Sequence, residues 1–145
     1  MTMVPQSQRR VLVDSSAFLA LRDRDDDNHA EAIAIINQLA RLRYRLYTTN
    51  AMLFEAHAPI LSVLGYQQAS QFLKDIDQRS TVVIRVRQTD EEQAKQILHR
   101  YTDKEFSCND ALSFVVMERL GISQAFTFDD DFAQYGLQVL EAEQD

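Results

Sequence analysis

Residues 9–21 read RRVLVDSSAFLAL, and this stretch decides the fold class. Its first part, RRVLVD, is a short apolar run typical of a buried strand. The apolar spacing of SSAFLAL predicts a helix that begins at Ser15 or Ser16. A strand that leads directly into a helix is typical of folds in which parallel strands alternate with helices. Asp14 is therefore expected at the C-terminal end of the first strand.

The same alternation continues along the chain. Four more strands are predicted, over YRLYTT (44–49), STVVIRVR (80–87), SQAFTFD (123–129) and GLQVL (136–140). Helical patterns separate the first four strands, which indicates a mostly parallel sheet covered on both faces. The expected fold is α/β: a single three-layer α/β/α domain over residues 1–145, with its core at about 11–140 and a sheet of four to five strands.

Helix boundaries follow from capping signals. Asn28 and Thr89 each precede a Glu by three residues, which is capping-box spacing, and Ser107 is a plausible cap for the helix that Gly121 closes. Pro59 lies within the helix after the second strand, and we expect it to kink or split that helix.

Composition narrows the class of protein. A chain of 145 residues with 46% hydrophobic and 26% charged residues describes one globular domain with a full core. No apolar run approaches the roughly 18 residues that cross a bilayer, and the N-terminus lacks the apolar stretch of a secretory signal. We therefore expect a cytoplasmic protein with no membrane association. A single cysteine supplies neither an internal disulfide nor a paired-thiol zinc pattern.

Acidic residues outnumber basic ones by 22 to 15, which gives a formal net charge of -7. This balance argues against a surface that coats nucleic acid in general. It does not exclude a nucleic-acid enzyme, because acids that converge on divalent cations have their charge cancelled locally.

Four acids fall where ligands bind in parallel α/β sheets, outside the carboxyl ends of the strands. Asp14 and Asp129 are expected to end two strands, Glu55 lies early in the helix after strand two, and Asp110 opens the helix before strand four. Clustered carboxylates repel one another unless a cation or a proton compensates them. All-oxygen ligand sets favour Mg²⁺ or Mn²⁺, and such a cation typically activates water for phosphodiester hydrolysis.

Each acid also has a structural interpretation. Asp110 follows Ser107 by three residues and is equally well the acidic member of a capping box. Glu55 is compatible with a surface helix, and Asp14 with an N-cap. In AFTFDDDF (125–132), the second and third aspartates are expected to belong to a solvated turn.

Four segments, VLVDSSAFLAL, TTNAMLFEAHA, FSCNDALSFVVMERLG and AFTFDDDF, resemble in this order the PIN-domain ribonucleases, including the VapC-type toxins of toxin-antitoxin pairs. The resemblance covers the chain from about Val11 to Leu140. It implies a Mg²⁺- or Mn²⁺-dependent endoribonuclease. Its catalytic and metal-binding acids would be Asp14, Glu55, Asp110 and Asp129.

The resemblance also implies supporting residues around these acids. Ser16 and Thr127 match positions where the family often keeps a small hydroxyl, whose expected role is to orient an acid or a water molecule. Asn109 departs from the small β-branched or hydroxyl residue common in relatives, and its amide can hydrogen-bond a neighbouring carboxylate.

For partners, the resemblance implies an RNA substrate, a homodimer and, in a toxin, a small antitoxin protein. Arg22, Arg24 and Lys104 are the candidate RNA contacts, although each is equally well a solvated surface residue. The alternative function is a catalytically weak PIN-fold binding or regulatory module that acts through a protein partner. An aspartate-nucleophile phosphatase is disfavoured because Ser16 stands where that chemistry requires a second aspartate, two residues after Asp14.

Overall fold

A computed structural model describes residue 5 and residues 8–143. Its strands form one all-parallel sheet in the order β3-β2-β1-β4-β5. The strands are β1 Arg10–Val13, β2 Arg45–Thr49, β3 Val82–Ile84, β4 Gln124–Phe126 and β5 Gln138–Val139. The predicted α/β fold with a mostly parallel sheet is confirmed. Strand β1 lies at the centre, and Val11, Leu12 and Val13 are 0–1% exposed, which explains its uninterrupted apolar run.

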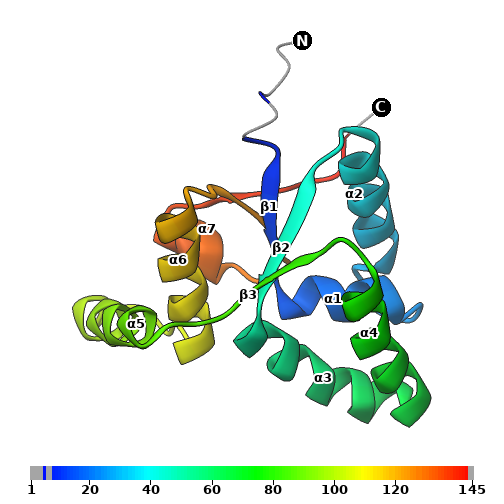
Figure 1. The fold of residues 1–145 in the computed structure, drawn as a ribbon, viewed down its shortest axis with the longest axis horizontal. Coiled ribbons are helices and arrows are strands. Elements are labelled where there is room, and N and C mark those ends of the chain that lie inside the picture. The colour runs from blue at the N-terminus through cyan, green and yellow to red at the C-terminus, as the bar shows by residue number, and fades with distance from the viewer. Residues whose placement is uncertain (1–4, 6–7, 144–145) are drawn as a thin grey trace.

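Helices cover both faces of the sheet. Those within the described residues are α1 Ser15–Arg22, α2 His29–Arg41, α3 Asn50–Leu64, α4 Tyr66–Gln78, α5 Gln88–Arg100, α6 Cys108–Leu120 and α7 Asp131–Tyr135. In Figure 1, α2 and α4 lie on one side of the sheet, and α5 and α6 lie on the other. Over the described part of the chain, no helix combines the length and the apolar character that a membrane span requires.

One predicted strand boundary near the site is wrong, and one predicted split of a helix is absent. Strand β4 ends at Phe126, so the segment up to Asp129 is a loop and not the end of a strand. Helix α3 is not split at Pro59 but runs unbroken to Leu64. A proline removes one backbone hydrogen bond, but the neighbouring Ala56 and Ile60 are fully buried, and their packing keeps this part of the chain helical.

Asn28 and Ser107 occupy the predicted N-cap positions of α2 and α6, and Gly121 closes α6 as predicted, but of the two N-caps only Ser107 makes capping hydrogen bonds with its side chain. The Ser107 side chain accepts a hydrogen bond from the Asp110 N–H at 3.0 Å, and Asp110 Oδ2 accepts one from the Ser107 N–H at 3.0 Å, which completes the capping box. The Asn28 side chain makes no capping hydrogen bond. Helix α5 begins at Gln88 rather than after Thr89, because the backbone N–H of Arg87 donates a hydrogen bond to Asp90 Oδ2 at 2.9 Å.

A buried ion pair fastens α5 to α6. Asp90 is 1% exposed, and it accepts hydrogen bonds from Arg119 Nε at 3.0 Å and from Arg119 Nη2 at 2.8 Å. Burial alone would raise the pKa of Asp90. The hydrogen bonds from Arg119 and from the Arg87 backbone outweigh burial and hold the pKa below its usual value.

We expect Asp90→Asn to lower the free energy of unfolding at pH 7 by about 3 kcal/mol, because it leaves Arg119 without its charged partner. Since the folded-state pKa is lowered, the contribution of Asp90 is present above the ordinary carboxyl pKa of about 4 and is lost as the pH falls through the folded-state value. Urea denaturation at pH 7 and at pH 3 measures both effects. Asp103→Asn, at a side chain 78% exposed, is the control. Equal midpoints for Asp90→Asn and wild type at pH 7 would contradict the expectation.

Candidate metal centre

Asp14 lies at the junction of β1 and α1, held in place by two hydroxyls. Its side chain is almost fully buried, with 3% of the residue exposed. Asp14 Oδ2 accepts hydrogen bonds from Ser16 Oγ and from Thr127 Oγ1, both at 2.7 Å. Burial raises the pKa of Asp14, although these two hydrogen bonds act against the shift, and the charge of Asp110 adds to it. Both hydroxyls predicted near the site therefore contact the same acid.

The same hydroxyls fix the loop that follows β4. Ser16 Oγ accepts the backbone N–H of Phe128 at 3.0 Å, and Thr127 Oγ1 accepts that of Asp129 at 3.0 Å. One residue further on, Asp129 Oδ1 accepts the backbone N–H of Asp131 at 3.1 Å, a local turn that leads into α7. The loop thus runs from Thr127, which contacts the buried Asp14, to Asp131, the first residue of α7.

Three carboxylates converge at this loop and the start of α6. One carboxylate oxygen each from Asp110, Asp129 and Asp131 lie within 4.8 Å of one another. We call these three residues the aspartate cluster. Burial, followed by the neighbouring carboxylates of Asp110 and Asp129, raises the pKa of Asp131 to about 7. Crowded negative charge of this kind is what a cation or a proton compensates.

Asp131 is the residue that sequence reasoning missed. The sequence predicts a solvated turn there, but Asp131 opens α7 and faces the other two aspartates. The signal that could have found it is the spacing of Asp129 and Asp131, because two acids two residues apart in a tight turn can present their side chains on the same side. Asp130, between them, is exposed and makes no capping hydrogen bond.

Glu55 reaches the same region from α3 but lies outside the aspartate cluster as defined by distance. Its carboxylate is exposed and is held on both oxygens, by Ser15 Oγ at 2.8 Å and by Asn109 Nδ2 at 2.6 Å. Ser15 adjoins Asp14 and Asn109 adjoins Asp110, so the contacts of Glu55 tie it to the neighbours of two acids. The amide of Asn109 does hydrogen-bond a carboxylate.

The aspartate cluster suits a hard divalent cation. Mg²⁺ takes oxygen ligands at about 2.1 Å, so ligand oxygens across the ion are about 4.2 Å apart. Small side-chain adjustments bring oxygens spread over at most 4.8 Å to this separation. In addition, the capping box occupies only Oδ2 of Asp110, and a carboxylate has two oxygens with about four acceptor sites.

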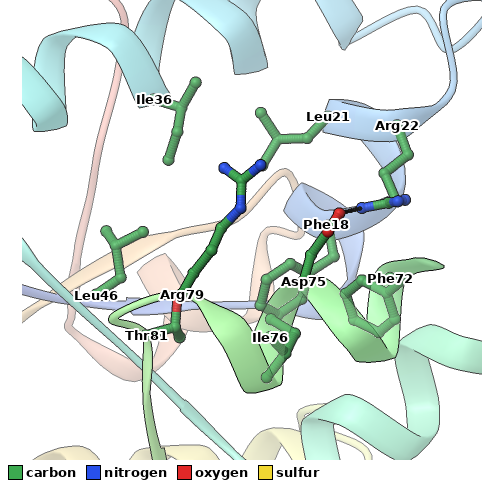
Figure 2. Close-up of a pocket in the computed structure, with 10 residues that line it drawn as sticks. All are labelled: Phe18, Leu21, Arg22, Ile36, Leu46, Phe72, Asp75, Ile76, Arg79 and Thr81. Atoms are coloured by element: carbon green, nitrogen blue, oxygen red, sulfur yellow. Dashed lines mark hydrogen bonds and ion pairs between the residues drawn. The ribbon is translucent and has the colours of Figure 1, made fainter.

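A cavity elsewhere in the molecule has a different character. It holds about 250 Å³ and is lined mainly by apolar side chains of α1, α2, β2 and α4. Figure 2 shows the Arg79 side chain reaching between Leu21 and Ile36, while Arg22 turns to Asp75. Arg22 Nη1 donates to Asp75 Oδ2 at 3.2 Å. Arg22 therefore joins α1 to α4, and its guanidinium already pairs with a carboxylate in this structure.

The fold and the site define a class: a parallel α/β domain that gathers carboxylates at the carboxyl edge of its sheet. Comparison with known proteins gives the family. Residues 11–137 match the PIN domain, and the chain belongs to the PIN domain family.

Known relatives extend over most of this chain. It is 30% identical over 136 residues to the 23S rRNA-specific endonuclease VapC20 of Mycobacterium tuberculosis, an alignment that covers 92% of this chain and 99% of VapC20. The crystal structure of VapC20, described as a sarcin-ricin loop cleaving toxin, superimposes with a TM-score of 0.83 at 29% identity and covers 90% of this chain and 98% of that one.

More distant structures share the fold alone. VapBC2 from Rickettsia felis, bound to a DNA fragment from its promoter, has a TM-score of 0.67 at 12% identity, with 90% of this chain and 97% of that chain covered. FitAcB from Neisseria gonorrhoeae has a TM-score of 0.63 at 11% identity, with 90% and 96% covered.

Proposed function

We propose that this protein is a divalent-metal-dependent endoribonuclease of the VapC toxin type. The observation that carries the proposal is the aspartate cluster beside the buried Asp14, in a chain that belongs to the PIN domain family. The name of the relative VapC20 points to ribosomal RNA as the first substrate to test. An activity on ribosomal RNA would place the protein in the cytoplasm.

The proposed metal ligands are drawn from five acids. Asp14, Glu55, Asp110 and Asp129 come from the sequence, and we add Asp131 because of its place in the aspartate cluster. The ligand set is entirely carboxylate, which favours Mg²⁺ or Mn²⁺ over zinc.

The chain's own groups prepare this chemistry before any substrate arrives. When bound, a divalent cation supplies the Lewis acidity that activates water and stabilises charge on a phosphodiester. Ser16 and Thr127 fix the orientation of Asp14 and, through the backbone N–H groups of Phe128 and Asp129, the shape of the loop. The protein therefore needs little rearrangement to present its acids together.

The proposal extends to domain organisation and partners. One buried cluster with members from Val11 to Phe132 supports a single domain over residues 1–145. By likeness to VapC-type proteins, we propose a small antitoxin as the inhibitory partner and a homodimer as the assembly. Exposed apolar side chains on α3 and α4, with Phe54 at 71% and Tyr66 at 75%, support a protein contact there. Light scattering after size exclusion tests the dimer.

RNA cleavage by purified, antitoxin-free protein tests the function. The substrates are 23S ribosomal RNA, an isolated sarcin-ricin hairpin, transfer RNA and a DNA hairpin of matching sequence, each with Mg²⁺, Mn²⁺ or EDTA. Defined RNA fragments that form with a cation and disappear with EDTA would support the proposal. A folded protein that binds Mn²⁺ weakly or not at all and cuts none of the RNAs would favour the alternative, a binding module that acts through a partner.

Substitution of the added ligand, Asp131, should raise the Tm without metal and reduce the stabilisation that a metal gives. A carboxyl pKa raised to about 7 destabilises the metal-free fold, and this cost grows as the pH rises from about 4 through 7. Asp131→Asn removes the cost, so we expect the Tm without metal to rise at pH 8 and to change little at pH 4. The same substitution should shrink the increase in Tm that Mn²⁺ produces at pH 8. Thermal unfolding with EDTA or with Mn²⁺ measures both.

Asp130→Asn is the matched control for this prediction, because it removes the same charge from the same turn at a side chain outside the aspartate cluster. A lower Tm for Asp131→Asn in EDTA at pH 8 would show that Asp131 stabilises the metal-free fold and would contradict the prediction.

A further inference from the structure

We infer that Asn109 and Ser15 are positioning residues that hold the Glu55 carboxylate in place for the metal site. This inference rests on the proposed function and assigns a task to two side chains that are not ligands. We call Ser15 and Asn109, with the carboxylate between them, the Glu55 clamp.

The Glu55 clamp joins three helices at one carboxylate. Ser15 on α1 donates from Oγ to Glu55 Oε1 at 2.8 Å, and Asn109 on α6 donates from Nδ2 to Glu55 Oε2 at 2.6 Å. Glu55 itself extends from α3. Each oxygen therefore has its own donor, and the donors approach from separate elements, which fixes both the position and the plane of the carboxylate.

A buried methionine contacts both donor residues of the clamp. Met52, 0% exposed on α3, accepts the Ser15 backbone N–H at its sulfur at 3.1 Å. The same sulfur lies 3.6 Å from Asn109 Nδ2. The donors of the clamp thus rest on a side chain that cannot move without disturbing the core.

Glu55 needs such support because it is exposed. A free glutamate side chain samples several rotamers, and ordering it costs up to about 1.5–2 kcal/mol. The other proposed ligands are aspartates with shorter side chains; Asp14 is held by two hydroxyls and Asp110 by its capping box. The clamp gives the long side chain of Glu55 a comparable degree of order before a cation binds.

The cost that Asn109 imposes argues against a purely structural role. Its Oδ1 atom is buried and finds no hydrogen-bond partner within the described part of the chain. A buried acceptor left unpaired costs about 1–3 kcal/mol. An apolar residue of similar size would avoid that cost, so the stability of α6 does not explain why an amide is present. The hydrogen bond that the amide donates to Glu55 explains it.

The two donors of the clamp are adjacent in sequence to two of the proposed ligands. Ser15 directly follows Asp14, and Asn109 directly precedes Asp110, so the backbone that places each donor also places an acid. A shift of α1 or α6 therefore moves Glu55 together with one of the two buried acids. The clamp keeps the three helices in one spatial relation at the site.

A double-mutant cycle with Mn²⁺ alone tests the inference. We compare wild type, Asn109→Leu, Glu55→Gln and the double variant by calorimetric titration with Mn²⁺ and by thermal unfolding in EDTA. Leucine resembles asparagine in shape but cannot donate. Asn109→Leu should raise the Mn²⁺ Kd about 10- to 100-fold, the range for residues that orient metal ligands. In the Glu55→Gln background, the same substitution should change the Kd less than about twofold, because its effect acts through Glu55.

Two further variants show whether the effect belongs to the clamp. Asn37→Leu makes the same substitution at an exposed position of α2 and should leave the Kd unchanged. Ser15→Ala should raise the Kd in the same direction as Asn109→Leu. An unchanged Kd for Asn109→Leu, or an equal increase with and without Glu55, would overturn the clamp while the metal site stands. A wild type that binds no Mn²⁺ overturns the metal site and the clamp with it.

Discussion

Asp110→Asn should lower metal-dependent RNA cleavage by at least about a hundredfold and leave the fold intact. A cation at a phosphodiester contributes several kcal/mol to the rate, and each 1.4 kcal/mol is a factor of ten. Asp110 belongs to the aspartate cluster and influences the pKa of both Asp14 and Asp131. Asparagine keeps the size of the side chain and an oxygen that can accept the Ser107 N–H, so the capping box survives. Cleavage rates at saturating RNA, with circular dichroism as the check on folding, measure the effect.

Asp130→Asn is again the matched control, because its side chain is exposed and lies outside the cluster. It should cleave at close to the wild-type rate. If Asp110→Asn remained folded and kept more than about a tenth of wild-type activity, the aspartate cluster would not be the catalytic centre.

Phe114→Ala should cost about 3–5 kcal/mol of unfolding free energy and lower the Tm by about 10 °C. The Phe114 ring is fully buried, stacks on Tyr135 with centroids 4.3 Å apart, and meets Phe106 and Phe132 edge-on at 5.1 Å. Phe114 lies on α6, and Phe132 and Tyr135 lie on α7, so these contacts join the two helices. Asp110 lies in the first turn of α6, and Asp131 is the first residue of α7. We therefore expect weaker Mn²⁺ binding as well as lower stability. Urea denaturation and titration with Mn²⁺ measure the two effects.

Phe54→Ala is the control for Phe114→Ala, because it makes the same truncation at an exposed position. Its ring is 71% exposed, so the same truncation should change the free energy of unfolding by less than about 0.5 kcal/mol in dilute protein. A loss below about 1 kcal/mol for Phe114→Ala would show that the surrounding rings close the space and that the α6–α7 contact does not depend on this side chain.

Much of the fold could be predicted because local patterns and tertiary packing agree. The apolar run of β1 is buried on both faces, and the Ser107–Asp110 box begins α6 as expected. Predictions failed where a local preference competed with packing. Pro59 does not split α3, since burial of neighbouring residues retains the helix. Helix α5 begins ahead of the predicted cap, because Asp90 accepts the backbone N–H of Arg87 and is itself held by Arg119.

The sequence led to candidate acids for the site but not to their geometry. The topology rule that ligands bind at the carboxyl edge of a parallel sheet led to the acids at Asp14, Glu55, Asp110 and Asp129. It did not separate Asp131 from an ordinary turn acid. The side-chain position of Asp131 depends on the path of the loop after Phe126. Hydrogen bonds from the backbone N–H groups of Phe128 and Asp129 to the hydroxyls of Ser16 and Thr127 set that path.

The order of strands and helices along the chain, the parallel character of the sheet and four of the five proposed ligands follow from the sequence alone, because these depend on periodicity and on position along the chain. Which carboxylate oxygens lie close together, and the membership of Asp131, follow only from the folded arrangement. Asp110 and Asp131 come together through ring packing between α6 and α7, and Glu55 is held by donors 40 and 54 residues away in the chain. Contacts between such distant residues depend on side-chain packing in three dimensions, which no local pattern contains.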